Sequence, residues 1–284
     1  MVKASDFETL ASELTFPEGP RWHDGKFWFS DFYSYSVYTL DSANKLEAVA
    51  KVPKQPSGLG WAPNGDLLIV SMLDHKLLRQ GNGKITEVAD MSAYAKVASN
   101  DMVVDKVGRA YVGNFGVELP IFDNPGSTNL VRVDPDGTVS VAADDMWFPN
   151  GTVITDDGKT LIIGESFADR LTAFDVAEDG TLSNRRVWAE LGKDGFPDGM
   201  CLDAEGAIWV CGPRLNKLTR VFEGGKVDVS VDFGDVKPVA CMLGGDDRKT
   251  LYVLTNTHVG PASAEAKGGK VEALRVDVPG AGLP

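Results

Sequence analysis

Four side chains that carry oxygen donors stand at one repeated position of this 284-residue sequence. Glu18, Asn150 and Asp198 each occupy the middle of a Pro-X-Gly tripeptide, and Asn100 lies in the looser copy Ser99-Asn100-Asp101. Two carboxylates and two amides, without histidine or cysteine, favour Ca²⁺, Mg²⁺ or Mn²⁺ over a dedicated zinc site. If the fold brings them together, the chemistry they indicate is hydrolysis at a divalent cation that keeps open coordination positions.

The tripeptide also has a purely structural interpretation. Proline and glycine are ordinary turn residues, so any single copy is explained by a tight start to a strand with a solvated polar residue at X. Four oxygen-bearing residues in register favour a functional site instead, because perturbed carboxylates gather at such sites. If the fold places Glu18 and Asp198 in one confined space, burying their two negative charges is costly unless a cation or protons compensate them.

The spacing of these residues predicts the fold that positions them. Position X recurs at intervals close to the roughly 40 to 50 residues of a propeller blade, at residues 18, 57, 100, 150, 198 and 240. A polar turn follows each X, with glycine in five copies and Arg248 in the sixth. An apolar β-prone run follows each turn, as in Phe27-Trp28-Phe29, and is typical of a strand. We therefore predict an all-β chain that forms a six-bladed β-propeller, as a single domain over residues 1–284. A β-sandwich of similar strand content is the alternative.

The geometry of a propeller predicts where the residues at position X lie. The first strand of each blade lines the central channel, so residues at one repeat position form a ring around it. The residues before Glu18 are expected to add a strand to the last blade, which would close the ring and leave no open sheet edge.

Composition restricts the partners and the compartment. A net charge of −13 argues against a nucleic-acid or anionic-membrane surface. No apolar run approaches the length of a membrane helix, and the N-terminus lacks the apolar core of a signal peptide. Cys201, Cys211 and Cys241 are odd in number and lie among apolar residues, as free thiols of a reducing compartment do. We expect a cytoplasmic protein.

Several motifs resemble those of the SMP-30 (regucalcin), gluconolactonase and sugar lactonase family. They are Phe16–Trp22, Pro149-Asn150-Gly151, Ser183–Arg186 and Pro197–Gly206. The resemblance spans nearly the whole chain and is strongest over residues 145–212. It implies a six-bladed propeller in which a central divalent ion hydrolyses lactones. The matching positions imply Glu18, Asn150 and Asp198 as metal ligands, with Asn100 beside the metal in contact with water or substrate. Ca²⁺ is the expected ion, with Mg²⁺, Mn²⁺ and Zn²⁺ as alternatives.

One departure from the family bears on the substrate. Sugar lactonases carry an arginine that holds sugar hydroxyls two residues before the position of Asn100, and this sequence has Ala98 there. The residues expected beside the channel are apolar, namely Met102, Trp147, Phe148, Phe196 and Met242. The long segment from Asn114 to Asn129 is rich in proline and glycine and is expected to form a loop over one end of the channel. The resemblance implies that Glu118, in this segment, lies in the family's substrate-contacting lid. A hydrophobic or aromatic lactone or ester is therefore expected as readily as an aldonolactone.

These observations give a mechanistic hypothesis and its alternatives. Asp198 is the expected general base, because a carboxylate at the metal can also hold the attacking water, and Asn100 and Asn150 would orient water and substrate. The expected partner is a small lactone or ester, with neither nucleic acid nor membrane. The alternatives are a metal-dependent esterase or phosphotriesterase, and a non-catalytic Ca²⁺-binding propeller.

Overall fold

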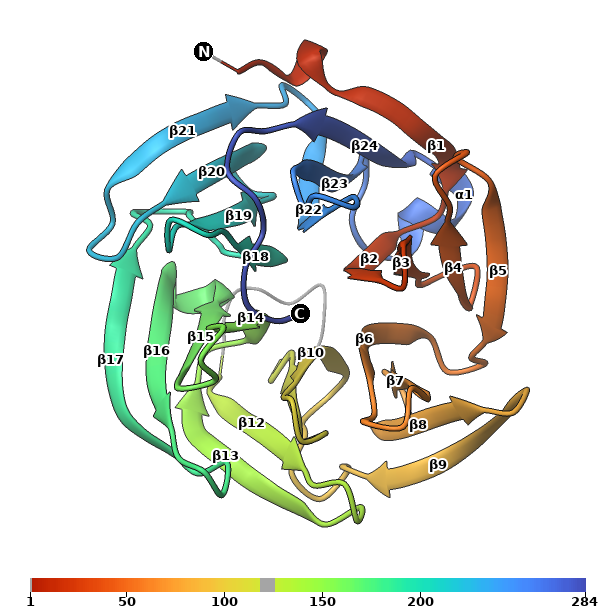
Figure 1. Ribbon diagram of the computed structural model, residues 1–284, viewed down its shortest axis with the longest axis vertical. Coiled ribbons are helices and arrows are strands. Elements are labelled where there is room, and N and C mark those ends of the chain that lie inside the picture. The colour runs from red at the N-terminus through yellow and green to blue at the C-terminus, as the bar shows by residue number, and fades with distance from the viewer. Residues whose placement is uncertain (1, 118–125) are drawn as a thin grey trace.

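Six four-stranded antiparallel sheets surround a central axis in the computed structural model, which describes residues 2–117 and 126–284 (Figure 1). The predicted six-bladed β-propeller is confirmed. In the first five blades the chain runs from the innermost strand outwards. Blade 1 contains β2 (Pro17–His23), β3 (Lys26–Asp31), β4 (Ser36–Leu40) and β5 (Leu46–Lys51). Blade 2 contains β6 (Pro56–Trp61), β7 (Leu67–Ser71), β8 (Lys76–Gly81) and β9 (Lys84–Asp90). Blade 3 contains β10 (Ser99–Val104), β11 (Ala110–Asn114), β12 (Thr128–Val133) and β13 (Val139–Met146).

The remaining blades follow the same order until the ring closes. Blade 4 contains β14 (Pro149–Ile154), β15 (Thr160–Glu165), β16 (Arg170–Val176) and β17 (Leu182–Glu190), and blade 5 contains β18 (Met200–Leu202), β19 (Ile208–Gly212), β20 (Lys217–Val221) and β21 (Val227–Asp232). Blade 6 joins both ends of the chain, with β22 (Lys237–Gly244), β23 (Thr250–Asn256), β24 (Gly269–Arg275) and β1 (Glu8–Leu14). The predicted closing strand is thus confirmed, with Glu8 opposite Ala273 and Leu14 opposite Gly269.

Helical turns are few and short in the described residues. They are η1 (Ala4–Asp6), η2 (Ser166–Ala168), η3 (Gly260–Ala262) and α1 (Ser263–Ala266). No helix in this part of the chain is long and apolar enough to cross a membrane.

The hairpin turns between the first and second strands need a left-handed backbone. The glycine of each turn has positive φ, from 71° at Gly25 to 95° at Gly108, and Arg248 takes the same conformation in the sixth copy with φ 58°. Glycine adopts this region without steric cost, which explains its recurrence in the other five copies.

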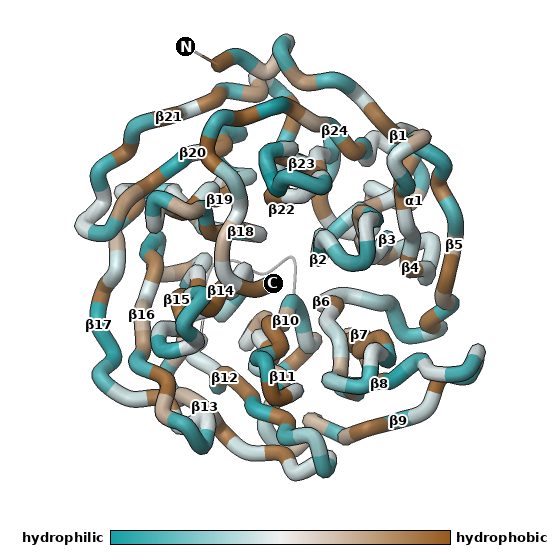
Figure 2. The backbone as a smooth tube through the Cα atoms, in the orientation of Figure 1, coloured by the Kyte–Doolittle hydropathy of each residue, from teal (hydrophilic) through white to brown (hydrophobic). Residues whose placement is uncertain are grey.

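Burial falls from the axis to the rim of the propeller. Every residue of β14 is buried, whereas β9 on the rim is mostly exposed. Apolar segments occur in every blade (Figure 2), and the buried ones pack between neighbouring sheets, as in the cluster that joins Leu68 and Val70 of β7 to Val112 of β11. Because each sheet hides its faces against its neighbours, the ring keeps the inner strands fixed in place.

The Pro-X-Gly tripeptide marks an irregularity of the inner strands. Pairing between the first and second strands shifts register immediately after X, for example between Glu18 and Arg21 and between Pro149 and Thr152, as a β-bulge does. A Cβ atom at Gly199 would overlap Ala240 of the next inner strand. The glycine therefore allows adjacent inner strands to approach closely at the ring.

Candidate active site

Five of the residues at position X lie at or just before the start of an innermost strand, and the sixth, Ala240, lies in the middle of β22. The six residues are Glu18, Ser57, Asn100, Asn150, Asp198 and Ala240. Hydrogen bonds join Ser57, Asn100, Asn150 and Asp198 across neighbouring blades, and Glu18 interacts with Asp198 through charge. We call Glu18, Ser57, Asn100, Asn150 and Asp198 the oxygen ring.

A chain of hydrogen bonds orders the amides of the oxygen ring. Ser57 Oγ donates to Asn100 Oδ1 at 3.3 Å, and Asn100 Nδ2 donates to Asn150 Oδ1 at 3.0 Å. Asn150 Nδ2 then donates to Asp198 Oδ1 at 2.7 Å and to Ser166 Oγ at 3.2 Å. Since both Asn150 amide hydrogens are engaged, its carbonyl oxygen is held in a fixed direction.

The two carboxyls of the oxygen ring hold their protons unusually tightly in the protein alone. Burial raises the pKa of Asp198 to about 7, with a further contribution from the negative charge of Asp101, although the hydrogen bond from Asn150 acts in the opposite direction. Burial also raises the pKa of Glu18 well above its ordinary value, and the charges of Asp198 and Asp101 add to the shift. When both carboxyls are ionised, positive groups of the surrounding protein do not fully balance their negative charge.

One buried ion pair lies next to the ring on the inner strands. Arg21 Nη2 contacts Asp101 Oδ1 at 2.6 Å, and Arg21 Nε donates to the carbonyl oxygen of Leu59 at 2.9 Å. Arg21 lowers the pKa of Glu18, but this is the smallest of the named effects on that carboxyl. Because Arg21 is already paired with Asp101, it leaves the repulsion between Glu18 and Asp198 largely uncompensated.

The donor set of the oxygen ring fits a hard divalent cation. Glu18 and Asp198 would supply two carboxylates and Asn150 a carbonyl oxygen, and a cation would remove the cost of burying both charges. No group of three or more His, Cys, Asp or Glu side chains with metal-binding geometry occurs among residues 2–117 and 126–284. A cation held by this ring would therefore depend on amide oxygen and on water or substrate to complete its coordination.

Polar residues at the ends of the second strands hold the backbone that precedes the ring. Asp31 Oδ2 accepts from the backbone N–H of Thr15 at 3.2 Å, Asn114 Oδ1 from that of Lys96 at 3.2 Å, and Glu165 Oε2 from that of Trp147 at 3.0 Å. Sequence reasoning missed these three positioning residues. The signal was a buried polar residue at the end of the second apolar run in successive repeats.

Glu165 is the most heavily engaged of these positioning residues. It is fully buried and contacts Arg185 Nη2 at 3.1 Å and Arg170 Nε at 3.0 Å. Arg185 also donates to the backbone carbonyl oxygens of Asp144 and Asp145, at 3.0 and 2.9 Å. Arg185, the first of the two arginines in Ser183–Arg186, thus supports the segment that leads to Asn150. Ser166, the next residue after Glu165, contacts both Asn150 and the carbonyl oxygen of Pro197 and was also missed.

Aromatic side chains gather beside the Asn150 and Asp198 side of the ring. The rings of Phe115 and Phe148 lie 4.7 Å apart, those of Phe148 and Phe167 5.3 Å, and those of Phe167 and Phe196 5.6 Å. The guanidinium of Arg214 lies 4.0 Å from the centroid of Phe196. We call these five residues the aromatic wall. Phe115, Phe167 and Arg214 were not singled out from the sequence, because each comes from a different loop.

The sequence-predicted substrate residues occupy different environments. Phe148 belongs to the aromatic wall, and Trp147 is half-buried with its backbone N–H held by Glu165. Met102 is fully buried in the core between blades 2 and 3, and Met242 is buried in the core of blade 6. These two methionines present no surface to a ligand. Glu118 lies outside the described residues. Ala98 is buried, and its carbonyl oxygen accepts from the backbone N–H of Phe115 at 3.0 Å.

Comparison with known proteins gives consistent matches over most of the chain. The family model described as "SMP-30/Gluconolactonase/LRE-like region" matches residues 16–257. A regucalcin of Danio rerio is 31% identical over 66% of this chain, and the match spans 64% of that protein, slightly less than two thirds of its length. The pentonolactonase XacC of Haloferax volcanii is 28% identical over 94% of this chain and 92% of that protein. The solved structure of a calcium-binding protein, regucalcin, from Agrobacterium tumefaciens has the same fold, with a TM-score of 0.81, 20% identity and coverage of 98% and 97%.

Proposed function

Because this chain belongs to the SMP-30/gluconolactonase/LRE-like family, we propose that it is a divalent-metal-dependent hydrolase that opens a lactone ring. The observation that carries the proposal is the pair of buried carboxyls, Glu18 and Asp198, on a hydrogen-bonded ring of amides. Strongly shifted carboxyls in a channel are typical of functional sites. The pentonolactonase among the relatives supports a lactone as the substrate class.

Glu18, Asn150 and Asp198 are the residues that we propose hold the cation, with Ca²⁺ as the first choice because all three donors are oxygens. When bound, the cation would supply Lewis-acid stabilisation to the carbonyl oxygen on which negative charge develops. The positive charge of the bound cation would also lower the pKa of both carboxyls, so that both would be ionised at neutral pH.

Asp198 is the proposed general base. It would accept a proton from the attacking water as the water oxygen bonds to the lactone carbonyl carbon. The bond between that carbon and the ring oxygen then breaks, and the proton passes from Asp198 to the departing oxygen. The product is an open-chain hydroxy acid, and Asp198 returns to its starting state. The 2.7 Å hydrogen bond from Asn150 fixes which oxygen of Asp198 remains available for the proton.

Asn100 is the proposed positioning residue for water and substrate. Its Nδ2 donates to Asn150 and its Oδ1 accepts from Ser57, so its side chain has a defined direction. Nδ2 carries a second hydrogen, which would donate to the attacking water or to the substrate.

A lactone with an aromatic or extended apolar group is the proposed substrate. Phe148 and Phe196 of the aromatic wall precede Asn150 and Asp198 by two residues and are buried, whereas Phe115 and Phe167 are half-buried and leave apolar surface. Apolar surface of this kind binds apolar ligands. Ala98 offers no hydrogen bond from its side chain to a sugar hydroxyl. Trp147 and Phe148 are proposed substrate contacts, together with Glu118, which falls between β11 and β12 in the sequence.

A hydrolysis panel with and without metal tests the proposal. The protein is treated with EDTA, dialysed, and assayed by pH indicator against gluconolactone, alkyl δ-lactones, dihydrocoumarin, p-nitrophenyl acetate and a phosphotriester, before and after addition of Ca²⁺, Mg²⁺ or Mn²⁺. We expect turnover of lactones only with metal, and a kcat/KM at least tenfold higher for the aromatic lactone than for gluconolactone. Equal lactone turnover in EDTA would exclude the metal-dependent mechanism, and turnover confined to the phosphotriester would replace the substrate class.

A further inference from the structure

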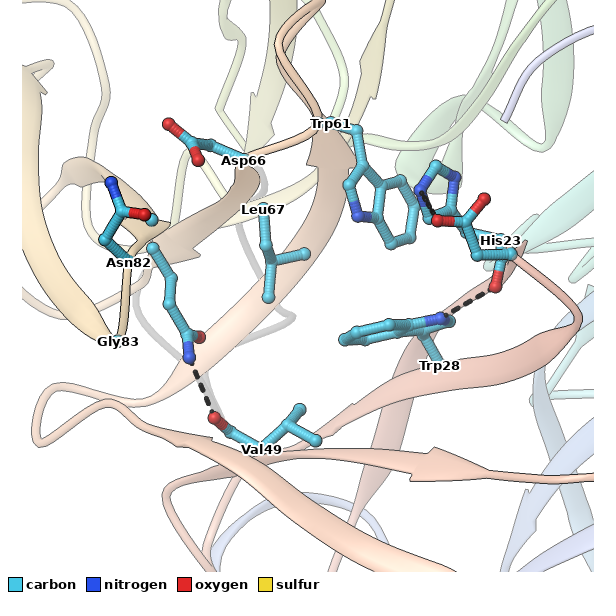
Figure 3. Close-up of a pocket in the computed structure, with 12 residues that line it drawn as sticks. His23, Trp28, Val49, Trp61, Asp66, Leu67, Asn82 and Gly83 are labelled. Atoms are coloured by element: carbon cyan, nitrogen blue, oxygen red, sulfur yellow. Dashed lines mark hydrogen bonds and ion pairs between the residues drawn. The ribbon is translucent and has the colours of Figure 1, made fainter.

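A second cavity lies between blades 1 and 2, at the turn end of their inner strands (Figure 3). Its volume is about 330 Å³, which is sufficient for one small molecule. It shares no residue with the oxygen ring or the aromatic wall. It is lined by His23, Asp24, Trp28, Val49, Trp61, Gly65, Asp66, Leu67, Gln80, Gly81, Asn82 and Gly83.

The cavity is separated from the oxygen ring along the inner strand. Glu18 stands near the start of β2, whereas His23 is its last residue. Five residues of a strand span roughly 15 Å. A ligand in this cavity would therefore not occupy the proposed catalytic position.

Two indole rings form a rigid right-angled corner in the cavity. The rings of Trp28 and Trp61 lie 5.5 Å apart at 80°, and the imidazole of His23 stacks on Trp61 at 3.8 Å and 12°. Trp28 Nε1 donates to the carbonyl oxygen of His23 at 3.0 Å. Because neighbouring groups hold both indoles, the corner exists before any ligand binds, and binding would require little ordering of side chains.

The polar lining is rich in negative charge and in hydrogen-bond acceptors. Asp24 contributes a carboxylate whose side chain is 86% exposed, and Asp66 contributes one that is 25% exposed and lies 3.7 Å from Nε of Arg79, a residue outside the twelve that line the cavity. Burial lowers the pKa of His23, although Asp24 acts in the opposite direction, so burial favours the neutral imidazole. Gln80 Nε2 donates to the carbonyl oxygen of Val49, while Gln80 Oε1 has no hydrogen-bond partner in the described part of the chain.

We propose that this cavity binds a small organic cation that carries an alkylated ammonium group. Indole faces attract cations through the negative potential of the ring, and the attraction is greater when the cation leaves bulk water. Asp24 supplies opposite charge beside the corner, Asp66 shares its charge with Arg79, and the N–H of a partly alkylated ammonium could donate to Gln80 Oε1. Two carboxylates repel an anion, and a neutral sugar would use the stacking surface but gain little from the charge.

Indole signals in a ¹H–¹⁵N spectrum provide a direct test, since the chain has six tryptophans. Trp28 and Trp61 are assigned by single substitution to phenylalanine. The calcium-loaded protein is titrated with tetramethylammonium chloride or with trimethylamine hydrochloride, and in separate arms with sodium chloride and with methyl α-glucoside. We expect saturable shifts of the Trp28 and Trp61 signals with the two ammonium salts only. A response equal to that of sodium chloride, or saturation by the glucoside alone, would overturn the proposal.

Substitutions then separate the aromatic contribution from the charge. Trp61→Leu is expected to weaken tetramethylammonium binding roughly tenfold or more, and Asp66→Asn roughly threefold to tenfold. Asp66→Asn retains an oxygen for the hydrogen bond from Asn64 Nδ2, so it keeps the test valid if Trp61→Leu does not fold. Glu223→Gln, an exposed change in the turn after β20, is the matched control and should have no effect. Unchanged affinity in both pocket variants would remove the cavity as the binding site. Lactone hydrolysis plays no part in this measurement, so its outcome is independent of the proposed function.

Discussion

Asp198 connects the chemistry of the ring to the stability of the protein without metal. Its folded-state pKa of about 7 lies above the ordinary value of 3.8, so the folded state binds the proton more tightly than the unfolded chain. The contribution of this carboxyl to stability is therefore complete below about pH 4 and is lost as the pH rises towards 7. A bound cation would remove this loss, because it stabilises the ionised form in the folded state.

The first prediction follows from the upward shift in the pKa of Asp198. In EDTA at pH 8, Asp198→Asn should be more stable than the wild type by roughly 2 to 4 kcal/mol, since a shift of one pKa unit corresponds to 1.36 kcal/mol. At pH 4 the two proteins should have nearly equal stability. Thermal unfolding followed by near-UV circular dichroism across this range checks both values. With Ca²⁺ the order should reverse, and a variant less stable than the wild type at pH 8 in EDTA would contradict the assignment.

Asn100 and Ser57 are neighbours in the ring and make a matched pair for a second prediction. Asn100→Ala should lower kcat by roughly 10- to 100-fold while Ca²⁺ affinity changes less than threefold, because Asn100 positions water and substrate rather than the ion. Ser57→Ala removes a single weak bond of 3.3 Å and should change kcat less than threefold. Lactonase kinetics and calcium titration calorimetry provide the measurements. Equal losses in both variants would indicate that the hydrogen-bonded chain acts only as scaffold.

At the scale of single residues, the sequence predicted which residues lie at the ring better than it predicted the direction in which neighbouring side chains point. The four oxygen-bearing side chains were found because they repeat, and three of them share hydrogen bonds in the structure. Met102 was expected among the apolar residues beside the channel, but its side chain is fully buried in the core between blades 2 and 3. The register of β10 shifts between Ser99 and Met102, and this irregularity turns Met102 into the core. A β-bulge depends on how two strands pair, and the pattern of residue types along one strand does not reveal it.

At the scale of elements, Glu165 joins β15 to the segment that precedes Asn150, and the third prediction concerns this connection. Glu165→Ala should destabilise the protein by roughly 3 kcal/mol, because it leaves Arg170 and Arg185 without their buried partner. It should also lower kcat, since the Trp147 N–H loses its acceptor and Asn150 follows Trp147 closely in the chain. Urea unfolding and lactonase kinetics measure the two effects.

A second ion pair in blade 4 provides the control for Glu165. Asp175 contacts Arg186 at 2.7 Å, but the Asp175 side chain is 48% exposed. Exposed pairs contribute about 0 to 1 kcal/mol, so Asp175→Ala should have a small effect on stability and none on kcat. If both variants lost stability equally while keeping full activity, the positioning role of Glu165 would be wrong.

Most elements could be predicted because their signals are local. An apolar run after an Asn-Gly or Asp-Gly turn specifies a hairpin within a dozen residues, and all six second strands appear where these runs predicted them. The connection between Glu165 and Trp147 spans 18 residues, and the backbone carbonyls that Arg185 contacts lie 40 and 41 residues away. Contacts at this range depend on the stacking of strands in the completed blade.

At the scale of the whole molecule, the repeat period predicted the ring, and the absence of a free sheet edge predicted its closure. β1 pairs with β24 although the two strands lie at opposite ends of the described chain (Figure 1). The segment before β1 also reaches blade 5, where the ring of Phe7 lies 5.4 Å from that of Phe233. The N-terminal segment therefore contacts two blades, and we expect these contacts to stabilise the closed ring rather than a single blade.

The last prediction tests that closure. Phe7 is buried, and Phe→Ala changes in a core cost about 3 to 5 kcal/mol, so Phe7→Ala should lower the midpoint of thermal unfolding by roughly 6 to 20 °C at about 2 to 4 °C per kcal/mol. Leu73→Ala truncates a side chain in a residue that is 53% exposed and should change the midpoint by less than about 2 °C. Because blade 6 supplies the edge on which β1 closes, Phe7→Ala should also increase hydrogen exchange in β24 more than in β12. Uniform exchange in both strands would mean that the propeller opens as one unit, and that closure at β1 is no weaker than any other contact between blades.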